Sequence, residues 1–515
     1  MNTDLLVIDL IHRASLLNHL LQTNNPPSDQ ETDDIRRLLC NIEEHIKTQG
    51  HGDAFDLASN HLEDLRKACR YALSGLRRLP VELISYIFSQ VMGDPLDTRR
   101  WDTLNVTKEP WTLAQVSSSW RAVALAHKEI WSHIGTDLTV ISYRPIPTVE
   151  MLLCSLLRSG NHTLSIKFRE ADTRTSRAKE LLFALFAHSH RWMDVTFDLS
   201  FQCFDLLNQV RGHLPLLRSL ALVTTGAVTS GTIRAFEVAP LLRDVSLDID
   251  HPCTLLLPWS QLILVDIWRI HNFKVLHNAS EVVDCSLTFD RWYEVAPSVP
   301  IVRLRKLRRL EVDSEQPLNG LEAPALEDLH INYRFMRPSA LHHVTFLLYR
   351  SSCSLQSLVL SRVSLASESD IKPLFESTPS LKYLQMKTVV VDWGVLHHLL
   401  TISDAQCLLP NLDTLKLVIG ENPFSPSSYK PSLLLNMLES RSYAAGRDGF
   451  TRLESIALLD LPYPLSSKHL ARLAKLEQLG LHVEDDTRLE EPRKVPPVDP
   501  WAWNRNVRGI GIWRS

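Results

Sequence analysis

The sequence predicts a chain of mixed structure, of the α+β or α/β class: an N-terminal helical hairpin and a three-helix module, followed by an irregular solenoid of stacked repeats. Its 515 residues exceed the ~250–300 that one hydrophobic core organises, so two or more structural units are expected. Apolar residues recur at helical spacing before about residue 135. After about residue 150 a short leucine motif recurs instead, which indicates strands.

The composition is that of an ordinary globular protein, with 44% hydrophobic and 22% charged residues. A formal net charge of -4 gives no overall field that would attract nucleic acid or an anionic membrane, so we expect neither as a partner. The 8 cysteines are scattered without a C-x-x-C pair, which argues against a zinc site and is typical of a reduced intracellular protein. Asp4, Asp9 and Arg13 interrupt the apolar N-terminus, so we expect no signal peptide or membrane span. The expected location is therefore the cytoplasm, the nucleus or both, without secretion.

Residues 1–75 are predicted to form a helical region. Ser28 followed by Glu31 matches a capping box, in which each residue satisfies a backbone donor at a helix start. Two apolar stripes at helical spacing follow, one on either side of residues 50–53: Ile35, Leu38, Leu39, Ile42 and Ile46, then Leu57, Leu62, Leu65, Cys69 and Leu73. We expect two antiparallel helices that pack on their neighbours or are coiled-coil-like; a dedicated dimerisation device is the alternative.

The pattern L-x-x-L-x-L dominates residues 150–487. It is the strand segment of a leucine-rich repeat, in which the last two positions point to one face of a strand. The clear copies are Leu217/Leu220/Leu222, Leu242/Val245/Leu247, Leu262/Val265/Ile267, Leu307/Leu310/Val312, Leu326/Leu329/Ile331, Leu355/Leu358/Leu360, Leu381/Leu384/Met386, Leu412/Leu415/Leu417, Leu453/Ile456/Leu458 and Leu476/Leu479/Leu481. Weaker copies are Trp192/Val195/Phe197 and Val282/Cys285/Leu287.

One such repeat cannot bury its apolar face alone, so stacked copies are expected to bury it together. Several copies begin with a proline, which ends a helix and extends the chain into a strand. The spacing runs from about 19 to about 41 residues, whereas regular repeats keep to ~20–29. We therefore expect an irregular leucine-rich-repeat-like domain over residues 150–487, with a generic α/β domain as the alternative. Residues 488–515 are rich in Trp and Pro and are expected to be an irregular tail.

Residues 76–134 carry a different set of motifs. Leu79-Pro80 precedes a predicted helix on which Leu83, Ile84, Ile87 and Phe88 share one face. A second apolar face follows after residues 92–110, which we expect to form an exposed loop. That face comprises Leu113, Val116, Trp120, Val123 and Ala124.

These residues resemble the F-box family, whose signature is Leu-Pro, an apolar first helix, L-x-x-V-x-x-x-W and a Leu-Trp-like pair. Here the matches are Leu79-Pro80, Leu83, Ile87 and Phe88, then Leu113, Val116 and Trp120, then Ile130-Trp131. Together with Thr23–Glu31, they are similar to the F-box-like proteins of mushroom-forming fungi. The resemblance covers about residues 15–135 and implies a three-helix F-box over residues 76–134.

The resemblance also implies a function. F-box modules bind a Skp-family adaptor and, through it, a cullin scaffold, so that a bound protein substrate is held near the ubiquitin-transfer site. The Skp-facing residues would be Leu79, Pro80, Leu83, Ile87, Val116 and Trp120. For Ile87 and Trp120, a role confined to the core of the module is the alternative.

No enzyme motif is found in the sequence, so we expect a non-catalytic adaptor without metal or cofactor. His342-His343 and His397-His398 lack metal-ligand spacing and are interpreted as surface or helix-flank residues. The densest basic run is Arg303, Arg305, Lys306, Arg308 and Arg309. We interpret it as a solvated face, and as the first candidate contact if the substrate is anionic. The rival overall prediction is an interaction scaffold independent of ubiquitin ligases, in which the F-box-like helices act only as a cap.

Overall fold

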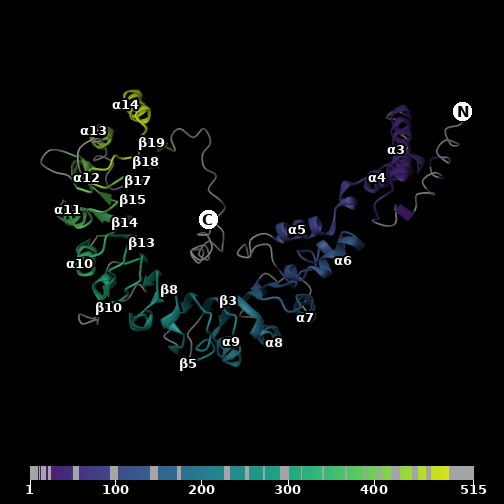
Figure 1. The fold of residues 1–515 in the computed structure, drawn as a ribbon, viewed down its shortest axis with the longest axis horizontal. Helices are drawn as coiled ribbons and strands as arrows, with labels where there is room; N and C mark the ends of the chain where they lie inside the picture. Colours follow the sequence, from purple (N-terminus) through teal and green to yellow (C-terminus); the bar gives the residue numbers. More distant parts are fainter. Residues whose placement is uncertain are drawn as a thin grey trace. The chain divides into compact units, whose positions relative to one another are not determined.

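The computed structural model describes 18 stretches of the chain. These are residues 25–49, 57–92, 102–139, 149–170, 175–225, 232–249, 254–270, 273–289, 301–314, 316–338, 341–365, 368–387, 390–391, 393–402, 408–418, 430–443, 450–459 and 465–485, preceded by Leu10, His12, Ser15, His19 and Leu20. The predicted tail, residues 488–515, and residues 93–101 of the loop predicted after Met92 lie outside them. The chain divides into two compact units, Met1–Arg191 and Trp192–Ser515 (Figure 1).

The first unit is mainly helical. Its α-helices are α3 (Asp29–Gln49), α4 (Leu57–Ala72), α5 (Val81–Met92), α6 (Ser118–Ala126), α7 (Val149–Arg158) and α8 (Thr175–Phe186). Its 3₁₀ turns are η1 (Gly75–Arg78), η2 (Leu113–Gln115), η3 (Lys128–Trp131) and η6 (Ser189–Arg191). Strands β1 (His133–Asp137) and β2 (Leu164–Arg169) pair in parallel, with Ile134 opposite Ile166.

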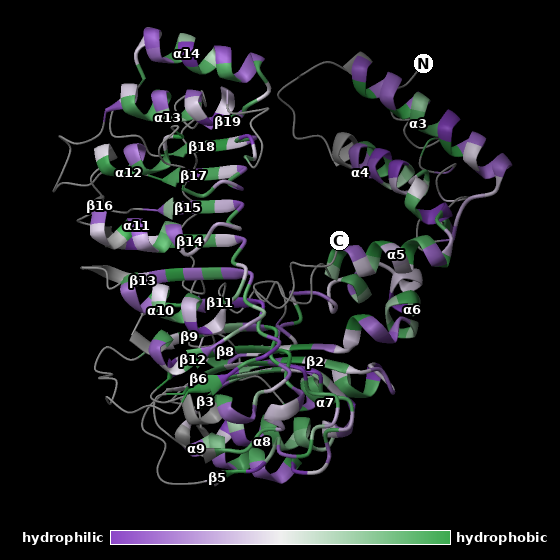
Figure 2. Cartoon of the chain, turned by 60° about the vertical axis from the view of Figure 1, so that its left-hand side comes forward, coloured by the Kyte–Doolittle hydropathy of each residue, from purple (hydrophilic) through white to green (hydrophobic). Residues whose placement is uncertain are grey.

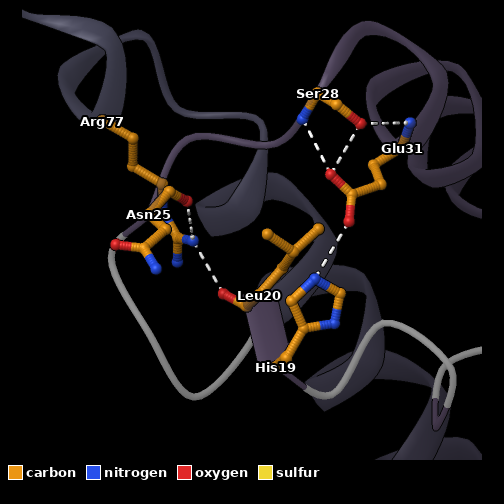
Figure 3. Close-up of polar contacts among 6 residues, drawn as sticks. All are labelled: His19, Leu20, Asn25, Ser28, Glu31 and Arg77. Carbon is orange, nitrogen blue, oxygen red and sulfur yellow. Dashed lines mark hydrogen bonds and ion pairs between the residues drawn. The ribbon is translucent and has the colours of Figure 1, made fainter.

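The capping box predicted at Ser28 and Glu31 is confirmed (Figure 3). The Ser28 backbone N–H donates to Glu31 Oε2 at 2.8 Å, and the Glu31 N–H donates to Ser28 Oγ at 3.3 Å. These bonds satisfy backbone donors that the start of a helix leaves unpaired, and α3 begins at Asp29, directly after Ser28. Two further contacts hold the chain before α3: His19 Nε2 lies 2.9 Å from Glu31 Oε1, and Arg77 Nη1 donates to the Leu20 carbonyl at 2.7 Å (Figure 3).

Helices α3 and α4 pack against each other through the two predicted apolar stripes. Ile35, Ile42 and Leu62 are fully or almost fully buried in this cluster, and Cys69 joins them. Leu39, Ile46, Leu65 and Leu73 are partly buried against it. The helical interpretation of this region is therefore confirmed, because the described residues of each predicted stripe are buried or partly buried in one cluster. The dimerisation alternative stays a prediction.

The second unit is built on a parallel β-sheet. Its strand order is β3-β4-β6-β8-β9-β11-β13-β14-β15-β17-β18-β19, with β16 paired to β14. The strands are β3 (Trp192–Ser200), β4 (Ser219–Thr225), β6 (Asp244–Ile249), β8 (Leu264–Ile270), β9 (Asp284–Phe289), β11 (Arg309–Val312), β13 (Asp328–Pro338), β14 (Ser357–Leu365), β15 (Tyr383–Lys387), β16 (Val390–Val391), β17 (Thr414–Val418), β18 (Ser455–Leu459) and β19 (His482–Asp485). Two short parallel pairs lie beside it: β5 (Thr232–Ile233) with β7 (Thr254–Leu255), and β10 (Val302–Arg303) with β12 (Leu321–Glu322).

Helices connect many of these strands. They are α9 (Phe201–Phe204), α10 (Leu341–Ser351), α11 (Glu368–Glu376), α12 (Trp393–Leu400), α13 (Pro431–Tyr443) and α14 (Ser467–Gln478), with 3₁₀ turns η7 (Asp205–Val210), η8 (Trp259–Gln261), η9 (Phe273–Asn278) and η10 (Gln316–Gly320). From α10 to α14, each helix packs against the next along the same side of the sheet (Figures 1 and 2). This arrangement covers one face of the sheet and leaves the other without helices from this row.

The strands are held in register by one row of buried side chains. Leu358 lies opposite Leu329 on one side and Leu384 on the other, and Leu415 lies opposite Leu384 and Ile456. All of these side chains are fully buried. Because side chains alternate between the two faces of a strand, a shift of one residue would expose the whole apolar set. The leucine pattern therefore determines the register of the sheet.

The predicted architecture is wrong. We expected a three-helix F-box followed by an irregular leucine-rich-repeat solenoid, but the structure has a large parallel β-sheet with helices, an α/β fold. The leucine pattern identifies which side chains of a strand are buried, and any buried parallel strand satisfies it, so it did not determine how the strands are joined.

The three-helix module is likewise not formed by the described residues of 76–134. After α6, the expected third helix is the short turn η3, because the chain continues at His133 into β1, which pairs with β2.

Substitution of Leu415 by Ala tests the role of the buried row. We expect it to destabilise the second unit by about 2–5 kcal/mol, because a fully buried leucine leaves a cavity between Leu384 and Ile456. Lys416→Ala, one residue on and pointing to the opposite face, should change the free energy of unfolding by less than about 0.5 kcal/mol. Chemical denaturation of the full chain measures both; equal effects would contradict the assigned register.

Candidate partner-binding site

The candidate site lies on the small helical cluster of the first unit formed by η1, α5, η2, α6 and η3. Its core contains Ile84, Phe88, Leu113, Val123 and Trp131, all buried. The Trp131 indole N–H donates to the Ala124 carbonyl at 2.7 Å. This bond joins η3 to the end of α6 and satisfies a polar group that would otherwise be buried without a partner.

Aromatic contacts complete this core. Phe88 and Trp120 meet edge to face, with ring centroids 5.1 Å apart, so α5 and α6 are joined by this pair. The rings of Trp111 and Trp131 are also 5.1 Å apart, and the Arg158 guanidinium lies 4.7 Å and 4.4 Å from their respective centroids. A cation over two indole faces fastens α7 to the cluster.

Local capping explains where the two main helices begin. Helix α5 starts directly after Pro80, whose carbonyl accepts hydrogen bonds from the N–H groups of Leu83 and Ile84, both at 3.1 Å. Helix α6 starts after Ser117, whose Oγ accepts from the Trp120 N–H at 3.1 Å. The sequence reasoning missed this cap, although a serine three residues before an apolar helical position is a recognised start signal.

The six predicted Skp-facing residues divide into two groups of three. Pro80, Leu83 and Val116 are exposed, with 49% of Leu83 and 61% of Val116 accessible to solvent. Leu79, Ile87 and Trp120 are half-buried. Leu79 and Trp120 pack partly against the cluster core, so these two side chains have a structural role as well.

Helix α5 separates its buried and exposed apolar residues by helical periodicity. Ile84, Phe88 and Met92 recur every four residues and form the buried stripe. Leu83, Ile87 and Val91 form the adjacent stripe, which is half-buried to exposed. A helix with a second apolar stripe that its own core does not cover is suited to packing against another protein.

Further exposed apolar side chains in this cluster were not predicted from the sequence. Leu76, Val81 and Tyr86 are all more than half exposed. A helical projection of residues 81–92 could have identified Tyr86, since it falls outside the Ile84/Phe88 stripe. The family motif alone gave no reason to choose it.

The loop predicted between Met92 and Pro110 is partly placed by the structure, from residue 102 onward. It was expected to be exposed, yet Thr103 and Asn105 are buried. The Thr103 carbonyl accepts a hydrogen bond from the Trp111 indole at 3.0 Å, and its Oγ1 accepts from the Gly135 N–H at 3.0 Å. The second half of the insertion is therefore part of the folded first unit.

The basic run of the second unit is largely neutralised by acidic neighbours. Arg303 pairs with Glu322 at 2.8 Å, Lys306 with Glu281 at 2.5 Å, and Arg309 with Asp284 at 3.0 Å. Among the described residues, the side chains of Arg305 and Arg308 have no hydrogen bond or ion pair. This distribution reduces the case for an anion-binding site on the five basic residues.

The histidine pairs do not form metal sites with their described neighbours. His342 and His343 lie side by side with ring centroids 3.9 Å apart, and a ring nitrogen of His343 is 2.9 Å from Asn319 Oδ1. His397 was interpreted as a surface or helix-flank residue but is buried in α12, and burial lowers its pKa to about 4. In the described stretches, no group of three or more His, Cys, Asp or Glu could hold a metal ion.

An acidic residue that the sequence analysis did not select lies on the sheet. Asp266 of β8 is 5% exposed, and its Oδ2 accepts hydrogen bonds from Ser246 Oγ and the Trp268 indole, both at 3.0 Å. Burial raises the pKa of Asp266 to about 6 although these bonds favour the charged form. A carboxylate held at such a cost to stability is a candidate for a functional role.

No protein-family model matches this chain, and no curated protein matches it in sequence. In the stretches that the structure describes, no helix combines the length and apolar character needed to span a bilayer.

Trp131→Phe tests the core of the helical cluster. We expect a loss of about 1–3 kcal/mol in the free energy of unfolding, because the Ala124 carbonyl loses its buried donor. Val116→Ser, at an exposed position, should change it by less than about 0.5 kcal/mol. Tryptophan fluorescence during urea denaturation reports both. A comparable loss in the Val116 variant would mean that this side chain is structural.

Asp266→Asn should stabilise the chain at neutral pH. The pKa of Asp266 in the folded state lies above the usual value of 3.8, so the folded state binds the proton more tightly than the unfolded state. The ionised carboxyl therefore destabilises the fold increasingly as pH rises from about 4 to about 6. A shift of this size corresponds to about 3 kcal/mol above that range. We expect the stability difference between variant and parent to grow between pH 4 and pH 7 in thermal denaturation. A difference that does not depend on pH would contradict the raised pKa.

Proposed function

We propose that this chain is a non-catalytic substrate-receptor adaptor of a Skp-cullin-F-box ubiquitin ligase. It binds a Skp-family adaptor through the apolar surface of α5, η2 and α6, and it holds a protein substrate on its second unit. In this proposal the chain acts in the cytoplasm, the nucleus or both. The fungal F-box-like proteins remain its suggested relatives, through the residues of the Leu-Pro and L-x-x-V-x-x-x-W motifs.

The observation that carries the proposal is the exposure of large apolar side chains over a well-packed core. Leu83 and Val116 are about half exposed or more, while Ile84, Phe88 and Trp131 of the same helical cluster are buried. Exposed apolar surface of this kind is costly in water and marks interaction sites. Burial against a partner would return ~25 cal/mol per Å² before ordering costs.

The same observation supports the adaptor proposal over the rival scaffold. Helices that served only to cap the chain would bury Pro80, Leu83 and Val116 against their neighbours. Among the described residues these side chains are instead accessible to solvent. Their accessibility favours a docking role over a capping role.

The test is co-purification of the full chain with a Skp-family adaptor after co-expression. We expect stoichiometric binding by the parent chain and its loss in Leu83→Ser/Val116→Ser. Both positions are exposed, so the variant should fold normally, unlike one at Leu79, which packs against the core. Thermal unfolding of each purified chain checks this.

The matched control is Leu153→Ser/Leu157→Ser on α7, where 46% and 81% of the two side chains are exposed. This pair removes the same kind of surface from the same unit and should leave binding unchanged. Absence of binding by the folded parent chain would reject the adaptor function and favour a scaffold independent of ubiquitin ligases. Equal loss in both variants would reject the assigned surface.

A further inference from the structure

The face of the sheet opposite the buried leucine row carries polar residues in register. Ser246, Asp266, Ser286, Glu311 and His330 lie opposite one another on the successive strands β6, β8, β9, β11 and β13. Because side chains opposite one another in adjacent parallel strands point to the same side, these five share a face. Adjacent members are separated by about 4.8 Å, the spacing of strands in a sheet.

A second row, two residues earlier on the same strands, adds further negative charge. Asp244, Asp284 and Asp328 lie in it with one cation, Arg309, which pairs with Asp284 at 3.0 Å and lies 3.8 Å from Asp328. The pKa of Asp244 is raised by burial and by the nearby carboxylate of Asp194. Together the two rows carry five carboxylates, those of Asp244, Asp266, Asp284, Glu311 and Asp328, and one arginine, Arg309.

The other charges on this face leave that excess in place. Arg269 already pairs with Asp248, so it does not neutralise Asp266 or Glu311. Burial lowers the pKa of His330 against the opposing effect of Glu311 and Asp328, which favours its neutral form at pH 7. The row that contains Asp266 and Glu311 thus has no lysine or arginine among its five members, and the one nearby arginine, Arg309, pairs with Asp284.

Two carboxylates in that row lack cationic partners. Asp266 is 5% exposed, and its Oδ2 accepts two hydrogen bonds. The Ser286 hydroxyl also favours the charged form of this carboxyl, while Oδ1 is buried without a hydrogen bond of ordinary geometry. Glu311, two strands away, is half-buried, and its side chain has no hydrogen bond or ion pair among the described residues. A buried carboxylate oxygen without a donor is unfavourable by itself, and a charged donor satisfies it best.

We propose that this acidic face, centred on Asp266 and Glu311, binds an extended segment of a protein partner through its lysine or arginine side chains. An ammonium or guanidinium group placed over Ser286 would lie between the two carboxylates and oppose the negative charge of both. The five strands span about 19 Å, so an extended segment of about six residues crosses the row. The half-buried Trp268 indole, which already orients Asp266, offers an apolar surface to the stem of such a side chain.

Peptide binding to this face does not depend on the adaptor proposal. Its identification as the substrate-binding surface does rest on that proposal, because only an adaptor would present a substrate there. A direct peptide-binding measurement therefore tests the acidic face separately from the adaptor function. The peptide can bind when the Skp-family adaptor does not, and the adaptor can bind when the peptide does not.

The experiment is fluorescence anisotropy of a labelled peptide of about ten residues that alternates lysine and serine, titrated with the full chain. We expect saturable binding by the parent chain and at least a ~10-fold weaker affinity in Asp266→Asn/Glu311→Gln. An otherwise identical peptide of glutamate and serine should not bind.

Glu368→Gln/Glu376→Gln is the matched control, since both glutamates are exposed on helix α11 and the net charge changes equally. It should bind the peptide as the parent chain does. Equal weakening in the two double variants would mean that net charge alone attracts the peptide, and it would overturn the proposal. No binding by the parent chain, or unchanged binding by Asp266→Asn/Glu311→Gln, would overturn it as well.

Folding is checked by the thermal midpoint, which we expect not to fall in the face variant. If the double variant does not fold, Glu311→Gln alone decides the matter, because this half-buried side chain has no partner whose loss would affect the fold. A several-fold loss of affinity supports the proposal, and an unchanged affinity overturns it.

Discussion

The second unit depends on one constraint: each strand of the parallel sheet must bury its leucines beside those of its neighbours. Leu329, Leu358, Leu384 and Leu415 lie opposite one another and are fully buried. No strand could hide these side chains alone, so the apolar contact and the backbone ladder stabilise each other. Because the inward positions are committed to this row, the alternate positions are free to carry charge. The acidic face around Asp266 is a consequence of the same alternation.

The first unit follows a different rule: its core is small, and some of its apolar side chains stay exposed to solvent. Phe88 and Trp131 occupy the interior of the α5 and α6 cluster, Trp120 packs partly against them, and few turns of helix surround them. A cluster of this size cannot cover every apolar side chain that it carries. Leu83 and Val116 therefore remain in solvent, where a partner can use them. The buried stripe of α5 thus stabilises the fold, and the adjacent exposed stripe of the same helix is the one proposed to bind a partner.

Much of the local structure could be predicted from the sequence, and the larger architecture could not. The Ser28/Glu31 box and the stripes of α3 and α4 depend on residues close in sequence, which periodicity and capping chemistry capture. The expected three-helix module was wrong because the chain after Trp131 forms strand β1, which pairs with β2. That pairing partner lies about thirty residues later in the sequence, so no local pattern reveals it. Asp266 was missed because its burial arises from neighbouring strands, and no local pattern of charges reveals it.

The central claim is that α5 and the turn and helix that follow it form a docking surface. The most direct measurement is amide hydrogen exchange of the full chain, with and without a Skp-family adaptor. The account predicts slower exchange in Val81–Met92 and Ser118–Ala126 when the adaptor is present, and no change in α7. Unchanged exchange in both helices at saturating adaptor, or protection confined to other segments, would contradict it.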